Sequence, residues 1–331
     1  MLDKEFNISN YSFVFILTDE NVAPFWLPEV CAWLHCPQAI EIVIKSGEQQ
    51  KNLRTVQRIW NKLLKNNADR HSLFINLGGG MVSDLGGFAA SCFKRGIDFI
   101  NIPTTLLAMV DASIGGKTGI DFGGFKNQIG VFSNPKDVLV DPVFLRTLPQ
   151  REILSGLAEM LKCGFIADSE LLQADLENYE SYIHRAAEIK KTIVAEDPFE
   201  QGKRKILNFG HTIGHAVESH YLTKELPLLH GEAVAVGMWC ALWLSVMKTG
   251  LDAAVLHDYE TKLPMLLSEA QMIVSVQDVD ESMKKLVHDK KMRGGKPQFV
   301  LLEAVGKPVV DVEVEPGLIC KALLQFRKMF S

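Results

Sequence analysis

Residues 73–88, LFINLGGGMVSDLGGF, decide the fold class of this chain. They begin with an apolar run typical of a buried strand, continue with three glycines, and end with helical spacing. Glycines let backbone N–H groups approach an anion closely, and the dipole at a helix start favours negative charge. The stretch therefore predicts a strand, a turn and a helix, with phosphate as a natural ligand. The G-x-G-x-x-G fingerprint is absent, and a glycine turn can also be purely steric, so both interpretations stay open.

The rest of the first half repeats this alternation of strands and helices. Short β-rich runs occupy residues 12–19, 40–48, 72–80, 99–105 and 137–142. Helical spacing is found in residues 51–66 and 82–93. This pattern predicts a Rossmann-like, mostly parallel α/β sheet with helices on both faces. Because ligands bind at the carboxyl ends of such strands, Asp19, Glu48, the three glycines, Thr104 and Thr105 are expected along one rim.

The second half has a different character. From residue 151 to about 290 the chain is rich in Ala, Leu, Glu and Lys with few β-branched runs, which predicts an all-α domain. We place the boundary near Leu148 and Pro149, giving domains 1–148 and 149–331. Residues 297–314 predict a β-hairpin that turns at 306–308, followed by a closing helix.

Composition narrows the class of protein. The chain has 331 residues, 47% apolar and 23% charged, the balance of a soluble globular protein. Its net charge of -5 argues against nucleic-acid or anionic-membrane partners. No apolar run approaches bilayer length, and the start, MLDKEFNISNY, lacks the features of a signal peptide. The six cysteines are scattered without C-x-x-C, so we expect free thiols and a cytoplasmic location.

A second glycine-rich segment, residues 110–130 (VDASIGGKTGIDFGGFKNQIG), has no clear period. We expect a long loop, and such loops usually exist for a site. Lys117 and Lys126 would suit phosphate, and Asp111 would suit a hydroxyl or an ammonium group. A flexible surface loop is the alternative, and the embedded apolar residues disfavour it.

Candidate metal ligands come from three stretches of the second half. Glu159 and Lys162 share a helical face at i, i+3 within apolar flanks, where a surface ion pair is the plainer alternative. LNFGHTIGHAVE (207–218) sets His211 and His215 four residues apart, as two metal ligands, as a base beside a ligand, or as ordinary helix residues. His230 precedes an apolar helix and alone would be structural. Together, two nitrogens and one carboxylate with an open position describe a catalytic zinc site.

Several cations accompany these residues. Arg204 and Asn208 precede His211, and Lys290 and Lys291 lie in HDKKMRGGK (288–296). Such a set predicts an anionic substrate that carries a phosphate and a carboxylate.

Taken together, the motifs resemble the 3-dehydroquinate synthases, of the sugar phosphate cyclase superfamily, over residues 12–310. The resemblance is carried by GEQQK, GGGMVSDLGGF, IPTTLLAMVDASIGGKTGID, GFKNQIG, FLRTLP, GLAEMLKCG, LNFGHTIGHAVE and LHGEAVAVGM, in this order. It implies an N-terminal α/β domain that binds NAD and an α-helical C-terminal domain that binds metal and substrate. It also implies a homodimer. The implied reaction converts 3-deoxy-D-arabino-heptulosonate 7-phosphate to 3-dehydroquinate and phosphate, a carbon–oxygen lyase step of the shikimate pathway with catalytic NAD and Zn²⁺ or Co²⁺.

The resemblance also assigns residues. The metal ligands would be Glu159, His211 and His230. NAD contacts would fall on Asp19, Asn21, Glu48, Lys51, Gly79, Gly80, Asp84, Thr104, Thr105, Lys126, Phe144 and Thr147. Substrate contacts would fall on Asp111, Lys117, Lys162, Lys190, Arg204, Asn208, His215 and Lys290, and Arg95 matches an arginine that reaches a substrate phosphate across the dimer interface. The resemblance thus assigns His215 to substrate binding and not to the metal.

Some positions depart from the family pattern. Pro198 replaces a glutamate after Asp197, Phe125 stands where glycine is common, and Asp121 stands where asparagine is common. Relatives that cyclise sedoheptulose 7-phosphate or glucose 6-phosphate rank second, because Arg204, Asn208 and His215 match the dehydroquinate type. A polyol dehydrogenase of the glycerol dehydrogenase kind and a non-enzymatic regulatory module are further alternatives.

Overall fold

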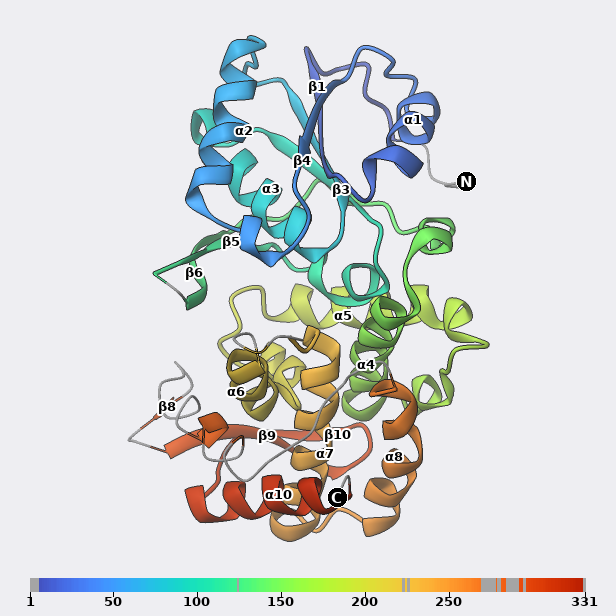
Figure 1. Ribbon diagram of the computed structural model, residues 1–331, viewed down its shortest axis with the longest axis vertical. Coiled ribbons are helices and arrows are strands. Elements are labelled where there is room, and N and C mark those ends of the chain that lie inside the picture. The colour runs from blue at the N-terminus through green and yellow to red at the C-terminus, as the bar shows by residue number, and fades with distance from the viewer. Residues whose placement is uncertain are drawn as a thin grey trace. The chain divides into compact units, whose positions relative to one another are not determined.

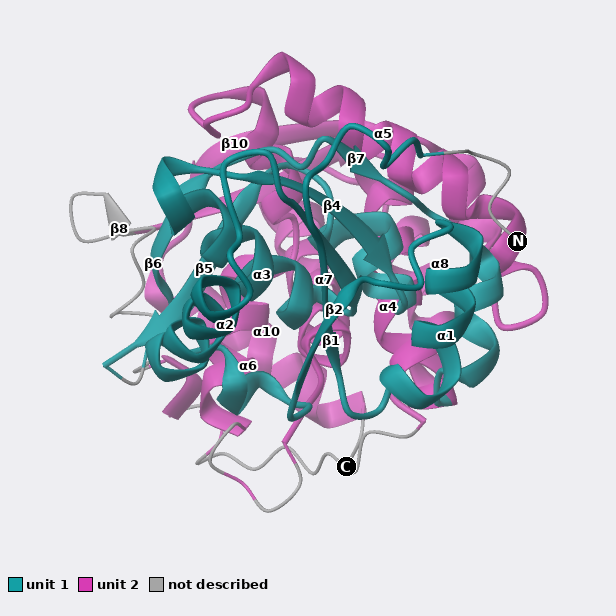
Figure 2. Cartoon of the chain, turned by 90° about the horizontal axis from the view of Figure 1, so that it is seen from above, with its two compact units in different colours: residues 1–149 teal, residues 150–331 magenta. Residues whose placement is uncertain are grey.

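The computed structural model describes residues 6–123, 125–221, 224, 227–268, 278, 281–283, 292–293 and 296–329 (Figure 1). The chain divides into two compact units, Met1–Pro149 and Gln150–Ser331, which Figure 2 colours separately.

Unit 1 contains a five-stranded parallel sheet. Its strands, in the order β2-β1-β3-β4-β7, are Ile40–Ile44, Val14–Asp19, Leu73–Gly78, Asp98–Pro103 and Asp137–Val138. Every adjacent pair is parallel, so the predicted α/β fold is confirmed. In the register Gly78 pairs with Pro103, and Leu17 pairs with Asn76, two residues before each strand ends. Asp19, Gly78 and Pro103 therefore end their strands at one edge, as the sequence predicts.

Helices cover both faces of this sheet. In Figure 1, α1 (Ala23–Trp33) lies on one side, and α2 (Leu53–Lys65) and α3 (Gly80–Cys92) lie on the other. The Asn52 side chain caps α2 by accepting from the backbone N–H of Thr55 at 3.0 Å. A Cβ on Gly86 of α3 would lie 1.8 Å from Oδ1 of Asn76 on β3. Glycine at this position therefore lets α3 pack directly on the sheet.

The prediction of a long loop over residues 110–130 was wrong. A short π-helix, η3 (Ala108–Ala112), leads into an antiparallel hairpin of β5 (Lys117–Phe122) and β6 (Phe125–Phe132). The glycines serve a close approach of strands: a Cβ on Gly130 would lie 2.3 Å from the carbonyl oxygen of Thr118. In the next pair of the hairpin, Ile120 lies opposite Ile129 and is fully buried.

Short 3-10 helices connect the elements of unit 1. They are η1 (Glu48–Gln50), η2 (Phe93–Arg95) and η4 (Pro142–Thr147).

Unit 2 is mainly helical, as predicted for the second half. Its helices are α4 (Gln150–Ile166), α5 (Ile183–Glu196), α6 (His211–Tyr221), α7 (His230–Lys248), α8 (Ala253–Leu266) and α10 (Pro316–Met329). Three 3-10 helices, η5 (Ser169–Gln173), η6 (Tyr179–Tyr182) and η7 (Lys203–Asn208), accompany them. An antiparallel sheet of β8 (Met292–Arg293), β9 (Lys296–Ala304) and β10 (Lys307–Glu313) contains the predicted hairpin. Ala304 pairs with Lys307, so the turn centres on residues 305–306, slightly earlier than expected.

Helix α7 forms the core of unit 2. It packs against α4, α6, α8 and α10. Within the described residues it is the one helix long and apolar enough, by length and composition, to cross a membrane, so the expectation that no run approaches this length was wrong. Of that window, 78% is buried inside the protein. The core helix of a globular unit passes the same test, so α7 is weak evidence for a membrane span.

Candidate active site

Glycines bring the start of α6 against α7. Residues 203–208 form η7, and Gly210, with a φ of +78°, turns the chain so that α6 begins at His211. A Cβ on Gly210 would lie 2.6 Å from Cγ of Met238, and a Cβ on Gly237 would lie 1.9 Å from the Gly210 carbonyl oxygen. The two helices therefore touch through their backbones, which sets His211 and His215 beside α7.

Three imidazoles converge as a result. His211, His215 and His230 each offer a ring nitrogen, and these nitrogens lie within 4.8 Å of one another. The ring centroids of His211 and His215 are 5.2 Å apart, and those of His211 and His230 are 5.4 Å apart. Among the residues that the structure describes, this is the group suited to hold a metal ion.

Glu159 of α4 completes the cluster. Its side chain is fully buried, and Oε1 lies 3.4 Å from Nε2 of His211 and 3.3 Å from Nε2 of His230. Two ligands bound at about 2.1 Å to a tetrahedral metal ion lie about 3.4 Å apart, so these separations match such coordination. Oε1 accepts no hydrogen bond within the described part of the chain. A metal ion would satisfy this buried oxygen, so the donor set fits a divalent cation such as Zn²⁺.

The far nitrogens of His211 and His230 each have an acceptor. Nδ1 of His211 lies 3.1 Å from the carbonyl oxygen of Phe209, and Nδ1 of His230 lies 3.3 Å from Oε2 of Glu218. With a metal ion bound, these acceptors would hold the proton on Nδ1 and leave Nε2 of each ring for the metal. Partners of this kind orient histidine ligands in metal sites.

The pKa directions describe the same electrostatics. Burial opposes the charge of Glu159, but Lys162 and the imidazoles outweigh it and hold the pKa of Glu159 well below its usual range. Burial, together with the charge of Lys162, lowers the pKa of His211 and favours its neutral, ligating form. Burial also opposes charge on His230, but Glu218 and Glu159 raise the pKa of His230 to about 10. Negative potential at His230 suits a cation.

Unit 2 contains buried cations, one of which lies beside the cluster. Lys162 forms an ion pair with Oε2 of Glu159, and the side chains of Lys162, Lys190 and Arg204 are all buried. Basic side chains of this kind are normally exposed, so their burial is typical of an anion site.

Asp197 and Pro198 hold Arg204 in place. Asp197 accepts hydrogen bonds from the backbone N–H groups of Gln201, Gly202 and Arg204. The Pro198 carbonyl oxygen accepts from Nη1 of Arg204 at 2.6 Å. The departure at Pro198 thus leaves a backbone contact to Arg204.

Sequence reasoning missed Glu200. Its Oε1 accepts a hydrogen bond from Nδ2 of Asn208 at 2.5 Å. The position of Glu200 four residues before Arg204 was the available signal, because it places a carboxylate inside the basic segment that leads to His211.

The expected cofactor residues of unit 1 gather at the carboxyl edge of its sheet. Oδ1 of Asp19 accepts from the backbone N–H of Asn21 at 2.9 Å. Gly79 caps α3, and a Cβ there would lie 3.0 Å from Cγ2 of Thr105. Thr104 is buried beside them, with its N–H bonded to the Gly78 carbonyl oxygen. The glycine turn thus opens α3 where a phosphate would meet backbone N–H groups.

Lys51 connects three parts of this edge. Its Nζ lies 2.7 Å from Oδ2 of Asp84 on α3, 2.6 Å from Oδ1 of Asn127 on β6 and 3.5 Å from Oε1 of Glu48. Its carbonyl oxygen accepts from the N–H of Asp121 on β5. These bonds fix the β5–β6 hairpin, which carries Lys117 and Lys126, beside η1 and α3.

Other expected residues have contacts of their own. The buried Phe144 ring packs edge-on against Trp26 in the core of unit 1, and the exposed Thr147 accepts a hydrogen bond from Nε1 of Trp26. Asp111 is half-buried in η3. Lys290 lies outside the described residues.

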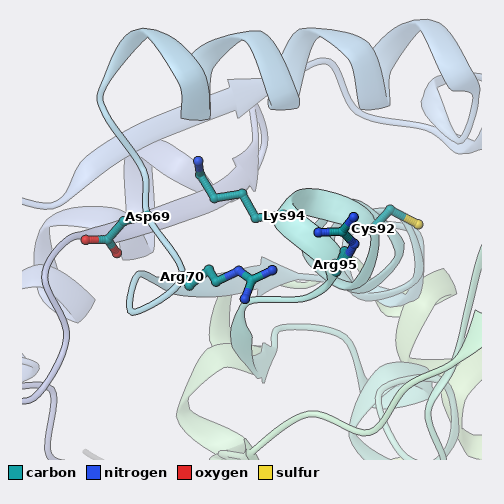
Figure 3. A pocket seen from close by; sticks show the side chains of 5 residues that line it. All are labelled: Asp69, Arg70, Cys92, Lys94 and Arg95. Atoms are coloured by element: carbon teal, nitrogen blue, oxygen red, sulfur yellow. The ribbon is translucent and has the colours of Figure 1, made fainter.

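Arg95 lies in η2, at the end of α3. Figure 3 shows it in a pocket of about 680 Å³ with Asp69, Arg70, Cys92 and Lys94. Lys94 and Arg95 both have positive φ values, 50° and 71°.

The fold and these clusters define a class: an α/β unit whose glycine turn suits a phosphate, joined to a helical unit whose buried donors suit a metal ion and an anion. The sequence matches the family models of the 3-dehydroquinate synthase N-terminal domain over residues 41–155 and of the C-terminal domain over residues 156–292. The chain therefore belongs to the 3-dehydroquinate synthase family. The family, fold class and enzyme type predicted from the sequence are confirmed.

Individual proteins agree with this assignment. The 3-dehydroquinate synthase of Parabacteroides distasonis is 42% identical over 334 residues, which cover 97% of this chain and 93% of that protein. A solved 2-epi-5-epi-valiolone synthase from Streptomyces hygroscopicus, with NAD⁺ and Zn²⁺ bound, is 28% identical with a TM-score of 0.83, covering 96% of this chain and 91% of that one. A 2-deoxy-scyllo-inosose synthase complexed with carbaglucose-6-phosphate, NAD⁺ and Co²⁺ shares the fold at 24% identity, with a TM-score of 0.84 and coverage of 98% and 92%. The cofactors predicted for this chain are those bound in these structures.

Proposed function

We propose that this chain converts 3-deoxy-D-arabino-heptulosonate 7-phosphate to 3-dehydroquinate and phosphate. The proposal rests on one observation: Nε2 of His211 and Nε2 of His230 both face the buried Oε1 of Glu159. These three residues would hold the divalent metal. The relatives at about 40% identity are dehydroquinate synthases, whereas the related cyclases are more distant.

Each unit has its own part in this proposal. Residues 1–148 would bind NAD through the glycine turn, the Lys51 cluster and Thr104–Thr105, and residues 149–331 would bind metal and substrate. When bound, NAD takes up and later returns a hydride, and the metal lowers the pKa of a coordinated hydroxyl.

The residues of the chain mainly bind and orient the substrate. Lys162, Lys190, Arg204 and Asn208 would hold its anionic groups, as their charge and burial support. His215 is left to hydrogen-bond a substrate hydroxyl beside the metal. The departing phosphate can accept the proton that is lost next to the new carbonyl, so the lysines would stabilise enolate charge.

Further substrate contacts are proposed for residues outside these clusters. Asp111 and Lys117 would contribute from η3 and β5, with Lys290 from unit 2. Arg95 of one subunit would reach the phosphate bound in the other, which requires a homodimer. The small anionic substrate, the net charge of -5 and the free cysteines support a cytoplasmic enzyme without nucleic-acid or membrane partners.

One assay tests the proposal against its alternatives. With Zn²⁺, substoichiometric NAD and the heptulosonate phosphate, the protein is expected to release phosphate without accumulating NADH. Net NADH formation would indicate a polyol dehydrogenase, and turnover of sedoheptulose 7-phosphate alone would indicate another cyclase. Intact NAD binding without any turnover would favour a regulatory module.

A further inference from the structure

We infer that Arg151, Ser155 and Glu232 are positioning residues that set His230 opposite Glu159. The inference rests on the proposed function, because it assumes that these two residues share a metal ion. Arg151, Ser155 and Glu159 lie four residues apart on α4, so they occupy one face of three successive turns.

The partners of these three residues are consecutive at the start of α7. Arg151 contacts Glu232, Ser155 contacts Gly231, and Glu159 faces His230. The start of α7 thus contacts three successive turns of α4 in a fixed register. The third of these contacts is the one between Glu159 and His230, which would share the metal ion.

The first step is a two-bond ion pair between the half-buried Arg151 and the buried Glu232. Nε of Arg151 lies 2.7 Å from Oε1 of Glu232, and Nη2 lies 2.8 Å from Oε2. Glu232 is 1% exposed and also accepts from the N–H of Leu229 at 2.7 Å. Nη2 of Arg151 further donates to the Pro227 carbonyl oxygen at 2.9 Å. The residues on both sides of His230 are therefore tied to α4 by charge-assisted bonds of fixed geometry.

The second step is a contact between backbones. The N–H of Gly231 donates to Oγ of Ser155 at 3.0 Å. A Cβ on Gly231 would lie 2.0 Å from the Ser155 carbonyl oxygen. Only glycine permits this approach, so the distance between α4 and the residue after His230 is fixed.

These contacts do what the remaining partner of His230 cannot. The bond from Nδ1 of His230 to Glu218 orients the imidazole ring but leaves the backbone position undefined. The contacts of Arg151 and Ser155 fix that position relative to α4, on which Glu159 stands. Loss of either is expected to misplace one ligand while the others stay.

The test measures metal binding in the full chain. For Arg151→Met and Ser155→Ala, the Zn²⁺ dissociation constant is measured by chelator competition, well below the unfolding temperature. The visible absorption of the Co²⁺-loaded protein reports ligand geometry. We expect the dissociation constant to rise about 10- to 100-fold, with an altered Co²⁺ spectrum, as for other residues that orient ligands. Arg151→Lys, which keeps the charge without the two-bond fork, is expected to recover part of the affinity.

Two controls separate positioning from general stability. Arg185→Met removes an arginine that pairs with Asp168 and Glu170 at the surface of the same unit. Asp252→Ala removes the cap of α8, where the Asp252 side chain accepts from the N–H of Ala254. Both are expected to keep wild-type zinc affinity and an unchanged Co²⁺ spectrum.

The outcomes distinguish this inference from the proposed function. If Glu159→Gln loses zinc while Arg151→Met and Ser155→Ala retain wild-type affinity and spectrum, the inference is wrong and the metal site stands. An equal loss of zinc affinity in Arg185→Met and Asp252→Ala would also overturn the inference. If Arg151→Met does not fold, Ser155→Ala alone decides. A wild-type chain that binds no zinc would overturn both proposals.

Discussion

Glu218 and His230 meet through one contact, 3.3 Å between Oε2 and Nδ1, that links the last turns of α6 to the first residue of α7. Glu218 is buried and His230 is half-buried, so the contact is only partly exposed to water. It gives the His230 ring its orientation, with Nε2 facing Oε1 of Glu159.

Removing this contact is expected to weaken zinc binding. In Glu218→Ala, the His230 ring loses its acceptor, and the zinc dissociation constant should rise about 10- to 100-fold. Chelator competition measures the change. Glu196→Ala is the matched control, because Glu196 pairs with Lys203 at the surface, 2.5 Å away. Unchanged affinity in Glu218→Ala would contradict the orienting role.

His211 and His215 are expected to respond differently to the same substitution. His211→Asn should lose both zinc and activity, since it removes a proposed ligand. His215→Asn should keep stoichiometric zinc and lose about 100-fold or more in rate, the usual effect of removing a catalytic hydrogen-bonding group. Metal analysis of the purified variants, followed by the phosphate-release assay, separates the two. Loss of zinc in His215→Asn would make His215 a ligand.

Lys51 is expected to matter for both stability and cofactor binding. Lys51→Met removes a cation that is 4% exposed and leaves the carboxylates of Asp84 and Glu48 without it. Because Lys51 is buried but its carboxylate partners are partly exposed, the free energy of unfolding in urea should fall by about 1–3 kcal/mol. The NAD dissociation constant should rise at least tenfold, because the β5–β6 hairpin loses its anchor. Lys65→Met, at the exposed end of α2, is the control, and an equal effect there would refute the assignment.

Gly86 and Gly317 test the close approach of α3 to the sheet. Gly86→Ala places a methyl group 1.8 Å from Oδ1 of Asn76 and 2.8 Å from Leu17, and should reduce the free energy of unfolding by about 2 kcal/mol or more. At Gly317 in α10 a Cβ meets nothing within 4 Å, so Gly317→Ala should be neutral or stabilising by up to about 1 kcal/mol. Urea unfolding of both variants gives the comparison. Equal stability would show that α3 can move away from β3.

The sequence predicted those elements whose pattern of apolar residues is local. The strand, glycine turn and α3 follow from apolar runs and spacing, and the edge that gathers Asp19, Gly79 and Thr104 follows from parallel strands. The β5–β6 hairpin was missed because Gly119 and Gly130, which indicate a loop in a single sequence, serve the approach of two strands. The resemblance, more than spacing, separated His211 from His215.

The supporting contacts of the candidate site escaped prediction for a different reason. Arg151 meets Glu232 across 81 residues, and Ser155 meets Gly231 across 76. Neither pair has a local pattern, because each depends on the register between α4 and α7. Glu200 and Glu218 carry no local signal of their contacts with Asn208 and His230.

The backbone contacts at Gly210, Gly231 and Gly237 have a consequence for how this sequence can evolve. Since α4, α6 and α7 meet at these points through main-chain atoms, the ligand positions depend little on which apolar side chains fill the surrounding core. The core of unit 2 should therefore tolerate exchanges among hydrophobic residues of similar volume. One added methyl group at any of the three glycines should instead displace the metal ligands and abolish metal binding. A comprehensive substitution library would show these glycines as invariant sites within a permissive background.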